Sequence, residues 1–278
     1  MSLKLAKFTE SPEKTLIIIV ILLISSYLEF LYGSIILGFF FLFILILVLI
    51  SFSRGIAGAW NPFLVILGIT IILLVLAYNY VTNGRWGNLD VMTMLFGFSL
   101  IFVSSPNKEI STISRFTAWL SALFVLSFGL LYSLPHLFGI PLPYYYGHYF
   151  VTLPVVLILK SFGLNLAASS MRIIEVNGVE PINLKIELSC FGWYSMLLAL
   201  STILSYNFTI KRIEKKKLML IILIAAFASY LANLLRVMIL VAVTYFYGIE
   251  KMLVIHPHVG WILFALILIP LMRFLIKP

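Results

Sequence analysis

Long, unbroken runs of apolar residues dominate the chain, and short polar or glycine-containing corners separate them. A helix needs about 20 apolar residues to cross the hydrocarbon core of a bilayer. Regular alternation of apolar and polar positions is absent across most of the chain, so the runs predict helices rather than barrel strands. We expect eight membrane-spanning helices, with the ranges 15–33, 34–52, 62–82, 90–105, 116–134, 191–209, 218–247 and 257–272.

The segment 135–189, between the fifth and sixth runs, does not fit this pattern. Its apolar stretch, 150–163, is short and contains Pro154 and Lys160. If this stretch crossed the membrane, Cys190 would move to the cytoplasmic side and the charge balance of the later loops would invert. We therefore expect 135–189 to be an external segment that lies on the membrane or dips into it.

Within this segment, 172–176 and 182–188 are two runs of the kind that forms β-strands. Asn177-Gly178 between them is a hairpin signal, although Pro181 loosens the register. The predicted fold is thus an all-α polytopic membrane protein with a small external β-hairpin. It forms one membrane domain, 1–278, with five spans in 1–134, the external segment 135–189, and three spans in 190–278.

The composition agrees with a membrane protein and excludes several other classes. Apolar residues make up 63% of the chain and charged residues 10%, against about 45–50% and about 25% in soluble domains. The mean hydropathy is +1.14. So few charges cannot cover a water-facing surface, which excludes a soluble globular domain, a nucleic-acid-binding domain and a disordered chain. The lipid bilayer is the expected environment.

The net charge of +9 is explained by sidedness, because cytoplasmic loops collect Lys and Arg. With the N-terminus inside, the cytoplasmic segments hold 13 of the 19 basic residues, and the inverse orientation leaves only six inside. The cluster 211–217 is the strongest anchor. We expect a multi-pass protein of the cell membrane with both termini in the cytoplasm.

This orientation places three kinds of reactive side chain at the outer face. Cys190 lies at the outer end of the sixth run. A helix from Leu218 to Arg236 rises about 27 Å, which carries Arg236 almost across the bilayer. Pro257 suits a first helical position, so His256 would occupy the N-cap and His258 the first turn of the last helix.

A thiol, a guanidinium and an imidazole at one depth are the groups that acyl transfer through a thioester needs. The thiol needs a nearby base or cation, the tetrahedral oxyanion needs a donor, and the leaving amine needs an acid. Each group alone also has an ordinary structural explanation. A lone cysteine is most often an inert apolar residue, an arginine near the headgroups can snorkel, and interfacial histidines are common.

The same residues resemble a known family. The segment 187–192 (Glu-Leu-Ser-Cys-Phe-Gly), the segment 233–237 (Asn-Leu-Leu-Arg-Val), Gly248, His256 and Gly260-Trp261 are similar in order and spacing to the exosortase/archaeosortase family of membrane cysteine transpeptidases. The resemblance covers roughly the last hundred residues. One departure is Phe191, which stands where the family usually has a small residue.

The resemblance implies a function and a set of roles. Cys190 would be the nucleophile, Arg236 would stabilise the oxyanion or the thiolate, and a histidine would be the acid/base. The family histidine precedes a glycine by four positions, which favours His256 over His258, and some archaeal members use a second arginine instead. The implied substrates are membrane-anchored surface proteins with a C-terminal motif, a transmembrane helix and a basic tail. The new C-terminus would pass to an acceptor such as a lipid.

Two other classes of function remain open on the sequence. In a membrane transporter or channel, Arg236 would bind an anion and Cys190 would be incidental. In a non-catalytic membrane scaffold, the hairpin would be the docking surface. We expect no cofactor and no metal, because the four histidines are scattered and only one cysteine is present.

Overall fold

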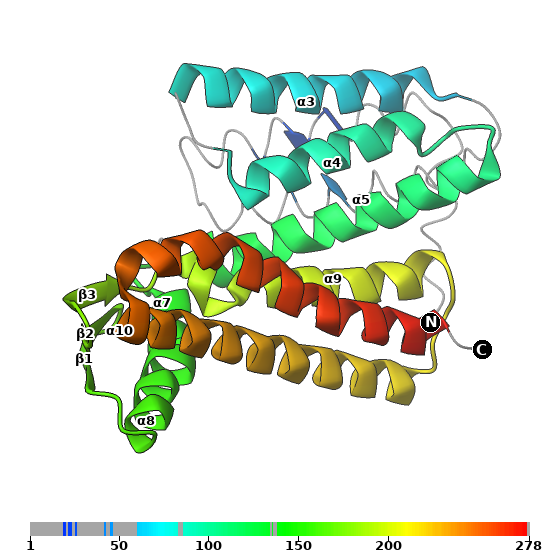
Figure 1. Cartoon of the computed structure of the whole chain (residues 1–278). Coiled ribbons are helices and arrows are strands. Elements are labelled where there is room, and N and C mark those ends of the chain that lie inside the picture. The colour runs from blue at the N-terminus through cyan, green and yellow to red at the C-terminus, as the bar shows by residue number, and fades with distance from the viewer. Residues whose placement is uncertain are drawn as a thin grey trace. The chain divides into compact units, whose positions relative to one another are not determined.

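The computed structural model of the chain is mostly helical and carries one small sheet (Figure 1). It describes residues 60–82, 86–133, 135 and 138–276, together with a few isolated positions between 19 and 46. The expected spans 15–33 and 34–52 therefore lie almost wholly outside the described residues. The chain divides into two compact units, Met1–Leu130 with Leu204–Arg212 and Leu131–Ile203 with Ile213–Pro278.

The first unit contains three of the expected helices in sequence. Their apolar faces meet around Leu64, Phe96 and Leu100, which are buried. A Cβ on Gly68 would overlap the Gly97 carbonyl oxygen, so the first two helices approach closely where glycines face each other. The helices are α3 (Pro62–Thr82), α4 (Asn88–Phe102) and α5 (Lys108–Phe128).

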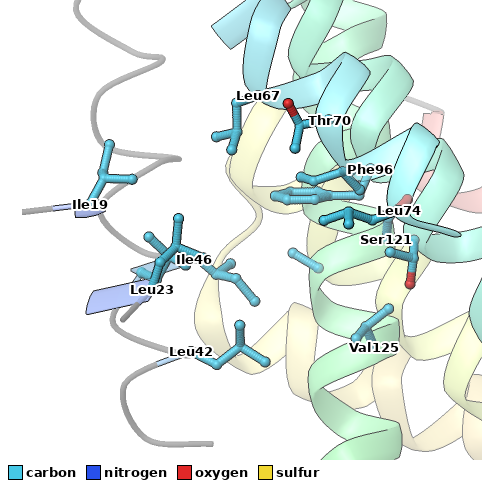
Figure 2. A pocket seen from close by; sticks show the side chains of 14 residues that line it. Ile19, Leu23, Leu42, Ile46, Leu67, Thr70, Leu74, Phe96, Ser121 and Val125 are labelled. Carbon is cyan, nitrogen blue, oxygen red and sulfur yellow. The ribbon is translucent and has the colours of Figure 1, made fainter. Parts of the chain in front are cut away.

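An apolar cavity of about 370 Å³ lies in this first unit (Figure 2). Side chains of α3, α4 and α5 line it together with described positions from the N-terminal part of the chain, such as Ile19 and Leu42. The polar groups among its lining residues are the hydroxyls of Thr70, Thr93 and Ser121. Because its described lining residues include no acidic or basic side chain that could activate these hydroxyls, we do not take this cavity as a candidate active site.

The second unit carries the sheet and the remaining described helices, except that the end of α9 from Leu204 on belongs to the first unit. The helix Leu142–Ser161 comes first, and it contains α7 (Leu142–Gly147) and α8 (Leu153–Ser161). The later elements, in chain order, are β1 (Leu166–Ser170), β2 (Ile173–Asn177), β3 (Pro181–Lys185), a 3-10 helix (Leu188–Phe191), α9 (Trp193–Thr209) and α10 (Lys215–Ile276).

The predicted hairpin is confirmed, and β1 extends it to a three-stranded antiparallel sheet in the order β1-β2-β3. Ile174 pairs with Leu184 across β2 and β3, and both side chains are buried in the core of the second unit. The tight turn after β2 docks on α10, because the Val179 N–H donates to the Tyr245 carbonyl at 2.9 Å. The hairpin is therefore part of the core of this unit rather than a free flap.

The helix Leu142–Ser161 differs from the expectation for this region. We expected 135–189 to be an external, interfacial segment whose apolar stretch was too short to cross. In the structure the tyrosine-rich residues before 150 continue the same helix, which makes it long and apolar enough to cross a membrane. Its crossing would alter the sidedness argument for the loops that follow.

Among the described residues, four helices are long and apolar enough to span, and α4 is a shorter apolar helix. They are Pro62–Val81, Lys108–Tyr132, Leu142–Ser161 and Lys215–Leu266. The last of these lies in α10, which contains both of the final two expected spans. The protein is therefore a membrane protein with several apolar helices, and the number of eight spans stays a prediction.

A single residue divides α10 into two arms. Gly248 has φ +80° and ψ 174°, a conformation that favours glycine, and the chain is helical on both sides of it. The second arm turns back along the first (Figure 1). The first arm runs unbroken from Lys215 to Tyr247 and therefore includes Asn233 and Arg236 in one helix.

The placement of the histidines also needs correction. His256 is not an N-cap and His258 is not in a first turn, because the second arm already begins after Gly248. Pro257 stands inside this arm, and because proline has no backbone N–H it cannot donate to the Leu253 carbonyl. The proline signal for a helix start was misleading here because the glycine upstream makes the turn.

Gly178→Ala tests the docking of the hairpin on α10. The added Cβ would overlap the main chain of Tyr245, so we expect the free energy of unfolding to fall by about 1–3 kcal/mol. Thermal unfolding in detergent measures this change. Val179→Ala is the matched control, because the Val179 side chain is 70% exposed and its backbone N–H is unchanged. Equal stability of the two variants would contradict this packing.

Candidate active site

Cys190 lies in a tight turn immediately before α9. The 3-10 helix Leu188–Phe191 ends at Gly192, whose φ of +75° redirects the chain into α9. The Cys190 N–H donates to the Glu187 carbonyl at 2.8 Å, and the Cys190 side chain is 7% exposed. The cysteine thus precedes its helix on a backbone whose direction is set by a left-handed glycine.

Asn233 in the first arm of α10 holds this turn in place. Its Nδ2 donates to the Cys190 carbonyl oxygen at 2.9 Å, and its side chain is buried. A Cβ on Gly192 would come within 2.5 Å of the Asn233 Cγ, so the contact needs glycine for space as well as for φ. The Ser195 hydroxyl adds a bond to the Gly192 carbonyl at 2.9 Å.

The side chains of Cys190 and Arg236 both approach one ring nitrogen of His256. The Cys190 Sγ lies 3.7 Å from His256 Nε2, and the Arg236 Nη2 lies 3.0 Å from the same atom. A guanidinium only donates hydrogen bonds, so Nε2 is the acceptor in the bond with Arg236. The geometry therefore assigns the ring proton of His256 to Nδ1 and leaves the basic nitrogen facing the thiol.

The folding of α10 explains why Arg236 and His256 meet. Arg236 and Gly260 stand the same number of residues from Gly248, one on each arm, and His256 is one helical turn nearer the break. A Cβ on Gly260 would lie 3.0 Å from the Arg236 Cζ and 3.1 Å from its Nε. The guanidinium therefore crosses the second arm at Gly260 and reaches along it to His256.

Of the sequence candidates, the structure brings Cys190, Arg236 and His256 together. His258 was the alternative expected from the sequence, but its side chain is exposed and takes no part in the contacts that form this cluster. A residue two positions away on a helix points to another face. We call Cys190, Arg236 and His256 the thiol–imidazole–guanidinium cluster.

Phe191, the departure from the family pattern, anchors the turn in the core. It is fully buried, and a Cβ on Gly147 would come within 2.5 Å of its ring. Tyr144 packs edge-on against Phe191 with 6.2 Å between ring centroids. Arg172 lies 4.7 Å over the Tyr144 ring, so this second arginine packs on an aromatic side chain that itself contacts the cysteine turn.

The role of Asn233 was missed at the level of the sequence. It stands three residues before Arg236, a spacing that places both on one face of a helix. An amide inside an apolar run was the available signal, because a polar group at membrane depth needs a partner. No group of three or more His, Cys, Asp or Glu residues that could hold a metal occurs in the described part of the chain.

The fold and the cluster define a helical membrane protein whose single thiol lies beside an imidazole and a guanidinium. A family model described as transmembrane exosortase matches residues 15–273, which is most of the chain. The chain therefore belongs to the transmembrane exosortase family. Neither the curated proteins nor the solved structures contain a match to it. The family assignment extends the resemblance from the last hundred residues to the N-terminal helices.

Gly192→Ala tests the packing of Asn233 against the cysteine turn. A side chain at a left-handed φ costs about 1–2 kcal/mol, and here the Cβ would also collide with Asn233. Gly139→Ala is the matched control, because Gly139 has φ +70° and nothing within 4 Å of its Cβ position. We expect Gly192→Ala to be the less stable variant in thermal unfolding and to alkylate at a changed rate at Cys190. Equal stability and equal alkylation rates in the two variants would show that Asn233 does not pack closely against the cysteine turn.

Proposed function

We propose that this exosortase-family protein is a membrane-embedded cysteine peptidase or transpeptidase that acts through the thiol–imidazole–guanidinium cluster. Its substrates would be exported, membrane-anchored proteins with a C-terminal sorting signal. The observation that carries the proposal is the convergence of Cys190 and Arg236 on His256 Nε2, at 3.7 Å and 3.0 Å. The three side chains come from a turn and from two arms of a folded helix, so their meeting is a product of the tertiary fold.

The first step would begin with proton transfer from the Cys190 thiol to His256 Nε2. That atom is the acceptor in its bond with Arg236, and once protonated it becomes a donor. Two donors cannot share a hydrogen bond, so the transfer would release the Arg236 guanidinium from His256. The freed guanidinium can then donate to the thiolate or to the oxyanion that develops on the substrate carbonyl.

The thiolate would attack the carbonyl carbon of the scissile peptide. A C–S bond forms, the C–N bond breaks, and His256 returns its proton to the departing amine. The departing fragment carries the transmembrane helix and basic tail, and the rest of the substrate stays on Cys190 as a thioester. An acceptor nucleophile would then attack the thioester, break the C–S bond and regenerate the thiol. A lipid acceptor makes the reaction a transfer, and water makes it hydrolysis.

The same proposal places the cluster near the outer leaflet. The first arm of α10 rises about 32 Å from Lys215 to Arg236, which is close to the thickness of the hydrocarbon core. The basic residues 211–217 at its start favour the cytoplasmic side. A substrate helix with a basic tail inside would present its motif at the depth of Cys190.

The two alternative functions have less support from the contacts. As a transporter or channel, the chain would use Arg236 to bind an anion, but its guanidinium is hydrogen-bonded to His256, and the cavity that it lines measures about 40 Å³. As a scaffold, it would dock partners through the hairpin, but the turn of that hairpin is bound to the Tyr245 carbonyl through Val179. Neither arrangement accounts for the thiol beside the imidazole.

Cys190→Ala is the direct test of the proposal. Because Cys190 is the only cysteine, no other thiol can replace it, and we expect substrate processing to be abolished while membrane insertion is normal. Reconstituted vesicles with a membrane-anchored substrate, followed by the size of the substrate on gels, provide the measurement. Processing at the wild-type rate in this variant would end the cysteine mechanism.

The two histidines provide a matched pair for the acid/base role. We expect His256→Ala to lower the processing rate by about 10²–10⁴-fold, the usual contribution of a positioned acid/base. His258→Ala, two residues away on the exposed face, should keep the rate within about twofold of the wild type, because an exposed side chain outside the cluster supplies no proton-transfer group. A larger loss in His258→Ala than in His256→Ala would contradict the assignment.

A further inference from the structure

Ser229, two helical turns before Arg236 on the same face of α10, has an unusual hydroxyl. The residue is 3% exposed, and its Oγ makes no hydrogen bond to any group in the described part of the chain. A buried hydroxyl in a helix commonly donates to the carbonyl four residues earlier, as Thr244 in the same helix does to the Leu240 carbonyl at 2.9 Å. A buried hydroxyl without a partner at membrane depth is costly, so the position calls for a ligand.

A small cavity has both Ser229 and Arg236 in its lining. It measures about 40 Å³, and its lining includes Ser195 from α9, Ser229, Asn233 and Arg236 from the first arm of α10, and Gly260 and Phe264 from the second arm. A cavity holds a water molecule when it offers about 10–15 Å³ and two to four polar partners. The volume suits one or a few waters and excludes a substrate side chain or a lipid chain.

The chemistry of the lining suits water as well. The Arg236 guanidinium only donates, so a molecule that contacts it there must accept. The Ser229 hydroxyl oxygen can accept a hydrogen bond from the same molecule. Asn233 uses its Nδ2 on the Cys190 carbonyl, which leaves its Oδ1 as a further acceptor. Water, with two donors and two acceptors, matches one donor and two acceptors arranged around it.

We propose that this cavity binds one or a few water molecules that link the Ser229 hydroxyl to the Arg236 guanidinium, and that Ser229 is a positioning residue for the thiol–imidazole–guanidinium cluster. The water fixes the side of the guanidinium that faces away from His256, and thereby keeps the other side on Nε2. This inference rests on the proposed function of the cluster. Ser229 would support the cluster from a position about 10 Å nearer the start of α10 than Arg236.

Ser229→Thr and Ser229→Val provide the matched pair. The two side chains have nearly the same shape, and only threonine keeps the hydroxyl. The first readout is the rate at which iodoacetamide alkylates Cys190, which needs no substrate and is unambiguous because the chain has one cysteine. We expect Ser229→Thr to retain most of the wild-type rate and Ser229→Val to lose about three- to tenfold, as for one neutral hydrogen bond.

A double-mutant cycle separates positioning from general packing. If Ser229 acts through Arg236, Ser229→Val changes the alkylation rate in the wild-type background and has no effect on it in Arg236→Ala. In processing assays, Ser229→Val should lower kcat and leave KM unchanged. Equal losses in Ser229→Thr and Ser229→Val, or a loss that persists in Arg236→Ala, would overturn the proposal.

The ligand itself is tested by exchanging the anion of the buffer. Alkylation rates in sodium chloride and in sodium gluconate should agree, because water is the ligand in both. A rate that rises with chloride and loses this dependence in Ser229→Val would assign the cavity to an anion and overturn the water site. Failure of this inference can be told apart from failure of the proposed function. If the chain does not process substrates, only the processing assays are affected, whereas the alkylation rates still report on Ser229 and Arg236.

Discussion

The candidate site depends on one hydrogen bond, the 3.0 Å contact in which Arg236 Nη2 donates to His256 Nε2. This bond fixes which ring nitrogen is free of a proton, and the same nitrogen lies 3.7 Å from the Cys190 Sγ. Once His256 Nε2 is protonated, it can no longer accept a hydrogen bond, so the Arg236 guanidinium would be released from it. Activation of the thiol and preparation for the oxyanion would then be two results of a single proton transfer.

The rest of the second unit serves to bring these three side chains to one point. Gly248 reverses α10 so that its arms return along each other, and Gly260 leaves the space in which the guanidinium crosses. Gly192 and Asn233 fix the backbone of the cysteine turn. At each of these glycines, a side chain would either collide with a neighbouring group or require an unfavourable φ. We therefore expect these positions to tolerate little substitution.

Much of the helical architecture could be predicted from the sequence, because apolar runs of bilayer length are a strong signal. The strands β2 and β3 were predicted from β-type runs around Asn177-Gly178, whereas in β1, Leu166–Ser170, the four residues after Leu166 are small and lack that signature. The helix Leu142–Ser161 was underestimated because its first half is rich in tyrosine, which is typical of the interface. The cluster could be placed at one depth but not assembled, since its contacts follow from the left-handed φ of Gly248, which no local pattern fixes.

The central claim is that Cys190 carries the acyl group of the substrate during the reaction. Intact-protein mass spectrometry of the enzyme, quenched in acid during turnover with a membrane-anchored substrate, tests it most directly. The account predicts an adduct on Cys190 with the mass of the substrate fragment upstream of the cleavage site, which neutral hydroxylamine removes as expected for a thioester. Product formation with no adduct on Cys190 at any time of quenching, including in His256→Ala, would contradict it.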